Sequence, residues 1–278
     1  MFRFAYRLAA ASGSLLVLTA CVGTPAGLQP HALKDEAGHK GYLGHDALAA
    51  LAANVPAPPA AGSTADQADK AASQALRRFE NTDRWLLATS HAEVRSPFAL
   101  QHFDCVLGVR YDPAQHQAPA TARVFDKLFE DAEAASTLVK RRAFRARPVG
   151  DDADREACQT VSSAGRNSPS YPSGSATVGA AYGAAMAAIA PDKAAEAKEI
   201  GRQIALSRAV CGMHYPTDVR VGAALGQAVF EQAARSPEFR ADLAAAQAEL
   251  AALRARGQTN PGCAAERRAL AMTQDLTL

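Results

Sequence analysis

The chain has 278 residues, of which 48% are hydrophobic and 21% are charged. This composition is sufficient for the core of one sizeable domain and excludes a disordered or collagen-like chain. The formal net charge is +2, and Arg3 and Arg7 account for it, because the first twenty residues contain no acid. The rest of the chain carries 28 basic and 28 acidic residues, so its charge gives no support for binding to nucleic acid.

The first twenty residues have the pattern of a secretory leader. A cationic start is followed by an apolar run, interrupted at residues 12–14, that is too short for a membrane-spanning helix. Residues 18–21 read Leu-Thr-Ala-Cys, which resembles a bacterial lipobox and predicts lipidation of Cys21 as the new N-terminus. We therefore expect an exported protein with a lipid anchor in the membrane, on the periplasmic side of the envelope. Val22 after the cysteine favours the outer over the inner membrane, and cleavage nearby that leaves Cys21 as a free thiol is the alternative.

The leader sets the expected domain organisation. Residues 1–20 are the lipoprotein signal peptide, 21–54 the anchor cysteine and a polar spacer, 55–258 a helical domain and 259–278 a C-terminal tail. Four cysteines follow the spacer, and an even number in an exported chain favours two disulfides with three possible pairings. None of them has the close spacing of a zinc site. These cysteines are Cys105, Cys158, Cys211 and Cys263.

The apolar periodicity predicts an all-α domain without internal repeats. The only plausible strand is 102–110, and the single tryptophan, Trp85, is expected to anchor the core. Between residues 148 and 174, Pro and Gly punctuate a polar stretch, which predicts a long loop of the kind that is usually functional. Helices are expected over residues 44–53, 66–92, 98–108, 119–145, 175–190, 192–211, 216–235 and 237–256.

Three short segments carry the residue types of a phosphoryl-transfer site. The first is basic, and the second leads into a helix. Lys140 and Arg147 are seven residues apart, which on a helix places both on one face near its end. Residues 171–175 read Tyr-Pro-Ser-Gly-Ser and lead into a helix. Free backbone N–H groups at that N-terminus, with Ser173 and Gly174, suit an anion.

The third segment combines a guanidinium, an imidazole and a carboxylate. Arg208 follows Ser207, His214 lies six residues further on, and Asp218 comes four residues later, where it could orient the imidazole. Each segment alone has a structural explanation, as a solvated basic face, a helix cap or a core histidine. Together they supply the cations that neutralise phosphoryl oxygens and an oriented imidazole that attacks phosphorus in line.

These segments resemble the signature of the phosphatidic acid phosphatase type 2 superfamily, which is K-x6-R-P, then P-S-G-H, then S-R-x5-H-x3-D. The surrounding sequence is similar to the bacterial class A non-specific acid phosphatases over roughly residues 55–255. This resemblance implies a single helical domain of the acid phosphatase and vanadium haloperoxidase type. It also implies hydrolysis of a small phosphate ester or diphosphate without metal or cofactor, and homo-oligomerisation as an option.

The resemblance assigns roles to individual residues. His214 would be the nucleophile that forms a phosphohistidine, and Asp218 would hold its imidazole in the productive tautomer. The resemblance also implies the disulfide Cys158–Cys211, and with it Cys105–Cys263. The ligands of the phosphoryl oxygens would be Lys140, Arg147, Ser173, Arg208 and the amide of Gly174.

The sequence departs from the family at Ser175, where the second motif ends in His. In the family that histidine protonates the leaving oxygen, and positioned proton transfer contributes about 10²–10⁴-fold to the rate. We therefore expect hydrolysis that is slowed or selective for acidic leaving groups, unless His91, His102 or His116 replaces the acid. The alternatives are a catalytically silent lipoprotein that binds phosphate or another oxyanion and, less favoured, a vanadate-dependent haloperoxidase with the same site.

Overall fold

The computed structural model describes residues 38–276, which lie within one of the two units of the chain, Leu33–Leu278. The predicted leader and the lipidation site Cys21 lie outside the described residues. Within these residues the chain is all-α, as expected, and contains no strand. No helix among them combines the length and apolar character that crossing a bilayer requires.

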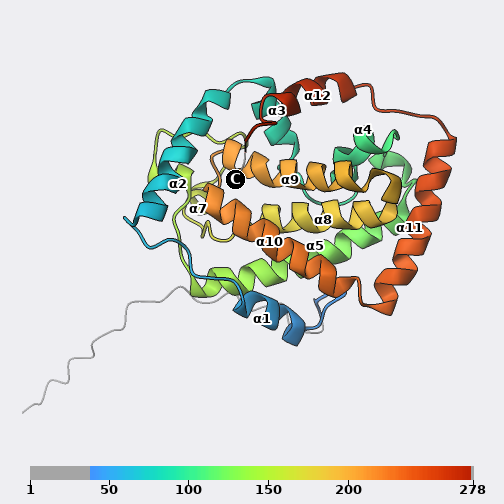
Figure 1. Cartoon of the computed structure of the whole chain (residues 1–278), viewed down its shortest axis with the longest axis horizontal. Coiled ribbons are helices and arrows are strands. Elements are labelled where there is room, and N and C mark those ends of the chain that lie inside the picture. The colour runs from blue at the N-terminus through green and yellow to red at the C-terminus, as the bar shows by residue number, and fades with distance from the viewer. Residues whose placement is uncertain (1–37, 277–278) are drawn as a thin grey trace, which may run out of the picture. The chain divides into compact units, whose positions relative to one another are not determined.

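Helix α8 (Gly174–Ile189) is the central element of the described fold, and most of its side chains are buried. It is apolar on all sides because other helices enclose it, so it shows no single hydrophobic face. α11 (Pro237–Ala255) packs across α8 and α5 (Pro119–Arg142) at one end (Figure 1). The three helices that run alongside α8 in Figure 1 are α5, α9 (Ala194–Val210, preceded by the 3₁₀ turn η5, Pro191–Lys193) and α10 (Pro216–Ala233).

Glycines bring α9 and α10 close to α8. A Cβ on Gly201 of α9 would lie 2.6 Å from the carbonyl oxygen of Gly179, and one on Gly226 of α10 would lie 2.0 Å from that of Thr177. These contacts exclude any larger side chain. As a result the N-termini of α8 and α10 lie together, and the N–H of Ser173 donates to the carbonyl of Asp218 at 3.0 Å.

The single helix expected over residues 66–92 is interrupted in the structure. Asn81 takes a left-handed φ of 62°, and Thr82 caps the next helix by accepting the N–H of Trp85 at 3.4 Å. Trp85 is buried, as expected, in the smaller of two hydrophobic clusters. The elements that replace the expected helix are α2 (Thr64–Ala75), the 3₁₀ helix η2 (Leu76–Phe79) and α3 (Asp83–Ser90).

The strand considered for residues 102–110 is wrong. This segment begins in the 3₁₀ helix η3 (Phe98–Phe103) and continues into the short helix α4 (Asp104–Leu107). Gly108, with φ 68°, ends α4 in a left-handed cap. A further 3₁₀ turn, η4 (Pro113–Gln115), precedes α5.

The helix expected over residues 119–145 ends three residues early, at Arg142. Arg147 has extended backbone, φ −84° and ψ 155°, because a residue before proline is disfavoured in the helical region. The prediction that Lys140 and Arg147 share one helix face is therefore wrong. They meet because both side chains donate to the carbonyl of Pro169.

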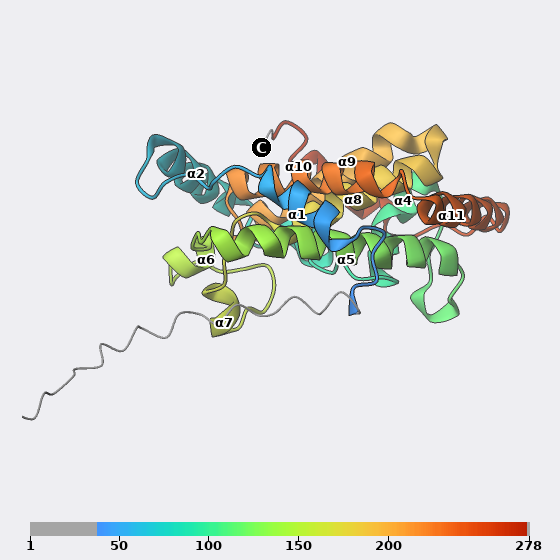
Figure 2. The same cartoon turned by 90° about the horizontal axis from the view of Figure 1, so that it is seen from below.

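The predicted loop of residues 148–174 is largely irregular, as expected, and contains two helices of one turn. These are α6 (Pro148–Asp151) and α7 (Ser163–Arg166), which lie near the C-terminal end of α5 (Figure 2). The loop therefore covers the end of the fold where α5 and α9 finish and α8 and α10 begin.

The folded region extends past both ends of the predicted domain, 55–258. α1 (His45–Ala53) packs on α5, and α12 (Cys263–Ala271) packs on α3. Both expected disulfides are confirmed: Cys105–Cys263 ties α12 to α4, and Cys158–Cys211 ties the irregular segment to the end of α9.

Candidate active site

His214 lies buried in the turn between α9 and α10. Gly212 makes this turn with φ 74°, and a Cβ there would lie 3.0 Å from the carbonyl oxygen of Glu156. The imidazole Nδ1 is 2.8 Å from the carbonyl oxygen of Ser170, and Nε2 is 2.9 Å from Nη1 of Arg147. Because a carbonyl can only accept, we assign the proton to Nδ1, which leaves the lone pair of Nε2 facing Arg147. This is the tautomer that a nucleophilic Nε2 requires.

Asp218 is linked to His214 through Ser170. The Ser170 hydroxyl donates to Oδ2 of Asp218 at 2.6 Å, and the hydroxyl oxygen of Ser170 lies 3.2 Å from Nδ1 of His214. Oδ2 also accepts the N–H of Tyr215 at 2.9 Å, which fixes the first turn of α10. The expected hold of Asp218 on the imidazole is therefore indirect, and Ser170 is the residue in contact with both.

Arg145 is the counter-ion of this carboxylate. Its Nη1 donates to Oδ1 of Asp218 and to Asp69, both at 2.7 Å, and its Nη2 donates to Asp66 at 2.8 Å. The guanidinium also lies over the Tyr215 ring, 4.3 Å from its centre. Three carboxylates thus neutralise Arg145, which joins α2 to the start of α10.

Neutral oxygens, by contrast, hold the three cations that the sequence motifs predicted. Nζ of Lys140 and Nη2 of Arg147 both donate to the carbonyl of Pro169, at 3.3 and 3.2 Å. Nη2 of Arg208 donates to Oε1 of Gln159 at 3.1 Å. Nε and Nη1 of Arg208 are buried and have no hydrogen-bond partner in the described part of the chain. These three charges are therefore available to an anion.

Burial lowers the pKa of all three cations, and repulsion from Arg147 adds to this effect at Lys140 and Arg208. Burial, and next the charge of Arg147, lower the pKa of Lys140 to about 7 and that of Arg208 to about 10. Burial lowers the pKa of His214 well below its usual range, and the three neighbouring cations lower it further. A bound anion would offset this repulsion, so the charge balance of the site favours an anionic ligand.

The N-terminus of α8 lies at the same site, as the sequence predicted. Ser173 is the N-cap residue, and its fully buried hydroxyl accepts the N–H of Ala176 at 3.3 Å. Gly174 begins the helix, and a Cβ there would be 3.4 Å from Oγ of Ser136 on α5. Ser175 follows in the first turn and is partly exposed. The N–H groups of this turn and the positive end of the helix dipole add to the anion-binding potential.

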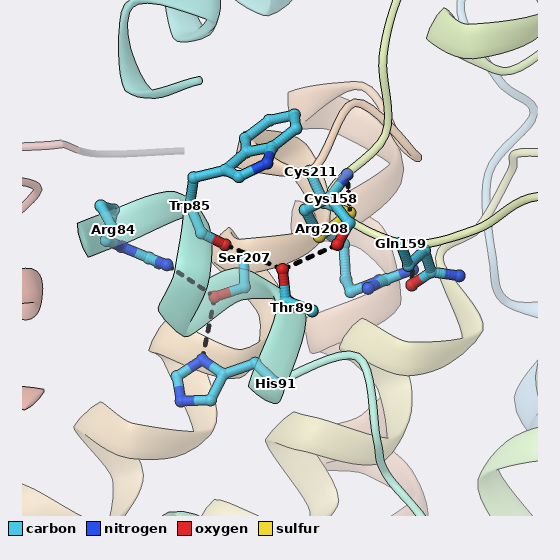
Figure 3. Close-up of a disulfide and its surroundings, with 9 residues drawn as sticks. All are labelled: Arg84, Trp85, Thr89, His91, Cys158, Gln159, Ser207, Arg208 and Cys211. Carbon is cyan, nitrogen blue, oxygen red and sulfur yellow. Dashed lines mark hydrogen bonds between the residues drawn. A yellow bond between two sulfur atoms is a disulfide. The ribbon is translucent and has the colours of Figure 1, made fainter. Parts of the chain in front are cut away.

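The three histidines considered as substitute acids are not positioned to protonate a leaving group at this site. His91 is buried, with Nδ1 2.9 Å from the Ser207 hydroxyl (Figure 3), and burial lowers its pKa well below the usual range. His102 is also buried, with Nε2 2.7 Å from the carbonyl of Glu93. His116 precedes α5, whereas Lys140 is near the other end of that helix, about 30 Å away at 1.5 Å per residue.

Three residues of the site were missed by the sequence analysis: Ser170, Arg145 and Gln159. Arg145 lies two positions before Arg147 in extended backbone, so alternation could have pointed to it once the helix end was known. Ser170 directly precedes the Tyr-Pro-Ser-Gly segment. Gln159 has no local sequence signal, because only the disulfide of its neighbour Cys158 brings it to Arg208.

Comparison with known proteins agrees with this geometry. The PAP2 superfamily matches residues 131–238, which include every motif residue from Lys140 to Asp218. The chain is 29% identical over 188 residues to the acid phosphatase of Zymomonas mobilis subsp. mobilis, covering 66% of this chain and 69% of that protein. It is 26% identical over 172 residues to the non-specific acid phosphatase of Salmonella typhimurium, with coverages of 62% and 68%. For the non-specific acid phosphatase of Providencia stuartii the identity is 25% over 179 residues, with coverages of 64% and 71%. Residues 131–238 therefore match the PAP2 superfamily, and the chain is similar to these bacterial acid phosphatases.

Proposed function

We propose that the protein hydrolyses small phosphate esters or diphosphates through a phosphohistidine at His214, without a metal ion. Nε2 of His214 attacks phosphorus, the P–N bond forms and the bond to the leaving oxygen breaks. Water then cleaves the P–N bond and releases inorganic phosphate. The observation that carries this proposal is the geometry of His214, whose unprotonated Nε2 faces Arg147 among cations that have no carboxylate hydrogen-bonded to them in the contacts described above.

The remaining residues act on the phosphoryl oxygens or on the imidazole. Lys140, Arg147 and Arg208 balance the charge on the three equatorial oxygens, which is the main catalytic requirement of phosphoryl transfer. The N–H of Gly174, at the start of α8, donates to one of these oxygens, and Ser173 shapes that helix start. Asp218 acts through Ser170 on the orientation of His214.

Ser175 makes the proposed enzyme selective for its leaving group. A serine hydroxyl is not acidic enough to protonate an alkoxide, and the locations of His91, His102 and His116 give it no substitute. Aryl phosphates and diphosphates release weakly basic oxygens, so they need little protonation. We therefore propose that good leaving groups are hydrolysed and that alkyl phosphates react slowly.

A second candidate function is phosphate or oxyanion binding without turnover. Ser175 in the position of the family's acid favours it, since the binding groups are present and the proton donor is missing. Retention of an oriented imidazole, which binding alone does not need, favours the enzyme.

The export and lipid anchoring expected from the leader belong to the same proposal. Two disulfides support an oxidising compartment such as the periplasm. Labelling of cells with a fatty-acid analogue, with Cys21→Ser as the control, tests the anchor.

Assays with p-nitrophenyl phosphate test the function. The proposal predicts release of p-nitrophenol in the presence of a metal chelator, inhibition by vanadate and loss of activity in His214→Ala. Tight binding of phosphate with no turnover of any aryl phosphate or diphosphate would support the second candidate instead.

A further inference from the structure

Arg208 is a buried arginine whose guanidinium is only partly satisfied by hydrogen bonds. Its side chain projects from the last turn of α9, and only 4% of the residue is exposed. Nη2 donates to Oε1 of Gln159 at 3.1 Å, whereas Nε and Nη1 are buried and have no partner in residues 38–276. Figure 3 shows the two side chains together beside the disulfide. Gln159 thus fixes one nitrogen and leaves two donors for a ligand.

The chemistry of the partner matters as much as its position. Arg145, two residues before Arg147 in the chain, is paired with three carboxylates, which compensate its charge. The amide oxygen of Gln159 accepts a hydrogen bond from Arg208 without cancelling its charge. A carboxylate at the same place would hold the guanidinium equally well and would compete with a bound anion.

The backbone of Gln159 is fixed relative to Arg208. Its neighbour Cys158 is bonded to Cys211, which lies three residues after Arg208. The N–H of Cys158 donates to the carbonyl of Cys211 at 3.4 Å, and its own carbonyl accepts the hydroxyl of Thr89 at 2.7 Å (Figure 3). The disulfide therefore links the segment that carries Gln159 to the helix end that carries Arg208.

We infer that Gln159 is a positioning residue of the phosphate site, which holds Arg208 in place as an uncompensated cation for the phosphoryl group. This inference rests on the proposed function, because it assigns Gln159 a part in binding the phosphoryl group that His214 attacks. Gln159 affects phosphate binding through Arg208, and the disulfide affects it by fixing the backbone of Gln159.

Calorimetric titration of the full chain with inorganic phosphate tests this inference without turnover. Gln159→Met keeps the shape of the side chain and removes the acceptor, so the dissociation constant for phosphate should rise about tenfold. Gln159→Glu keeps the acceptor and adds a negative charge, so the dissociation constant should rise by at least as much. Thr89→Val, which removes a neighbouring hydrogen bond to the same segment, should change it by less than about twofold.

The Met variant separates positioning from a structural role. If Gln159 only stabilised the fold, folded Gln159→Met would bind phosphate as the wild type does, since it adds no charge to the site. Equal phosphate affinity of Gln159→Glu, Gln159→Met and the wild type would overturn the inference and leave the proposed function intact. Failure of the wild type to bind phosphate would overturn both, and it would appear before any variant is compared. Thermal unfolding of each variant confirms that the compared proteins are folded.

Discussion

Ser170 donates its hydroxyl hydrogen to the carboxylate of Asp218 over 2.6 Å and presents the same oxygen 3.2 Å from Nδ1 of His214. Its backbone carbonyl lies 2.8 Å from the same nitrogen. One buried serine therefore makes two contacts with the imidazole, and only the hydroxyl contact depends on its side chain. The two contacts can be separated by mutation.

Ser170→Ala should lower kcat/KM for an aryl phosphate about tenfold, the effect of losing one hydrogen bond to a charged group. The backbone carbonyl stays, so the tautomer of His214 is kept. If Ser170 transmits the effect of Asp218, Asp218→Asn should cost less in the Ser170→Ala background than in the wild type. A double-mutant cycle on kcat/KM measures this coupling, and additive effects of the two substitutions would contradict the link.

Ser175→His should restore the missing acid. Protonation helps most where the leaving oxygen is basic, so hydrolysis of an alkyl phosphate should rise by about 10²-fold or more, and that of p-nitrophenyl phosphate much less. The measurement is kcat/KM for both substrates in both proteins. Similar gains on both substrates, or no gain on either, would mean that proton donation at position 175 does not limit the reaction.

The dependence of kcat/KM on pH should reflect the lowered pKa of two buried groups, His214 and Lys140. The lowered pKa of His214 keeps its imidazole neutral, and therefore nucleophilic, below pH 6.5, so activity should persist on the acid side. The pKa of Lys140 is lowered to about 7, so its charge is lost as pH rises through that value and kcat/KM should fall there. Lys140→Arg keeps the charge and should move this fall to higher pH.

The titration of the substrate is common to both proteins and cancels in their comparison. Coincident profiles of kcat/KM for the wild type and Lys140→Arg would exclude Lys140 as the group that titrates near pH 7.

Substitution of the two arginines in residues 143–147 should have different effects on the stability of the protein. Arg145→Met leaves the buried carboxylates Asp69 and Asp218 without their counter-ion, so the free energy of unfolding should fall by about 3–5 kcal/mol. Arg147→Met removes a cation held by neutral oxygens and should change stability by less than about 1 kcal/mol while abolishing activity. Urea unfolding followed by Trp85 fluorescence measures the free energy of unfolding of both variants. Comparable losses of stability would show that Arg147 also has a structural role.

Sequence patterns identified the motif residues because phosphoryl chemistry needs specific side chains at characteristic spacings. They also predicted the all-α class, since apolar periodicity reports helices directly. They failed at the end of α5, where the basic run from Lys140 continues in helix-forming residues. Only the proline after Arg147 and the burial of Arg145 show that the chain must leave the helix there.

Long-range contacts were the other part that the sequence left open. The family resemblance implied the pairing Cys158–Cys211, but nothing in the local sequence linked Gln159 to Arg208, 49 residues away. Asp218 was recognised by its spacing to His214, and its actual partners, Ser170 and Arg145, depend on how the irregular segment folds over the helix ends. Such contacts follow from tertiary packing, which local patterns do not report.

The most direct test of the account is to trap the covalent intermediate. The protein is mixed with an aryl phosphate, quenched with alkali to preserve phosphohistidine, and digested for mass spectrometry. The account predicts phosphate on the peptide that contains His214, in the wild type and not in His214→Ala. Turnover without any phosphorylated peptide, or phosphate on another residue, would contradict it.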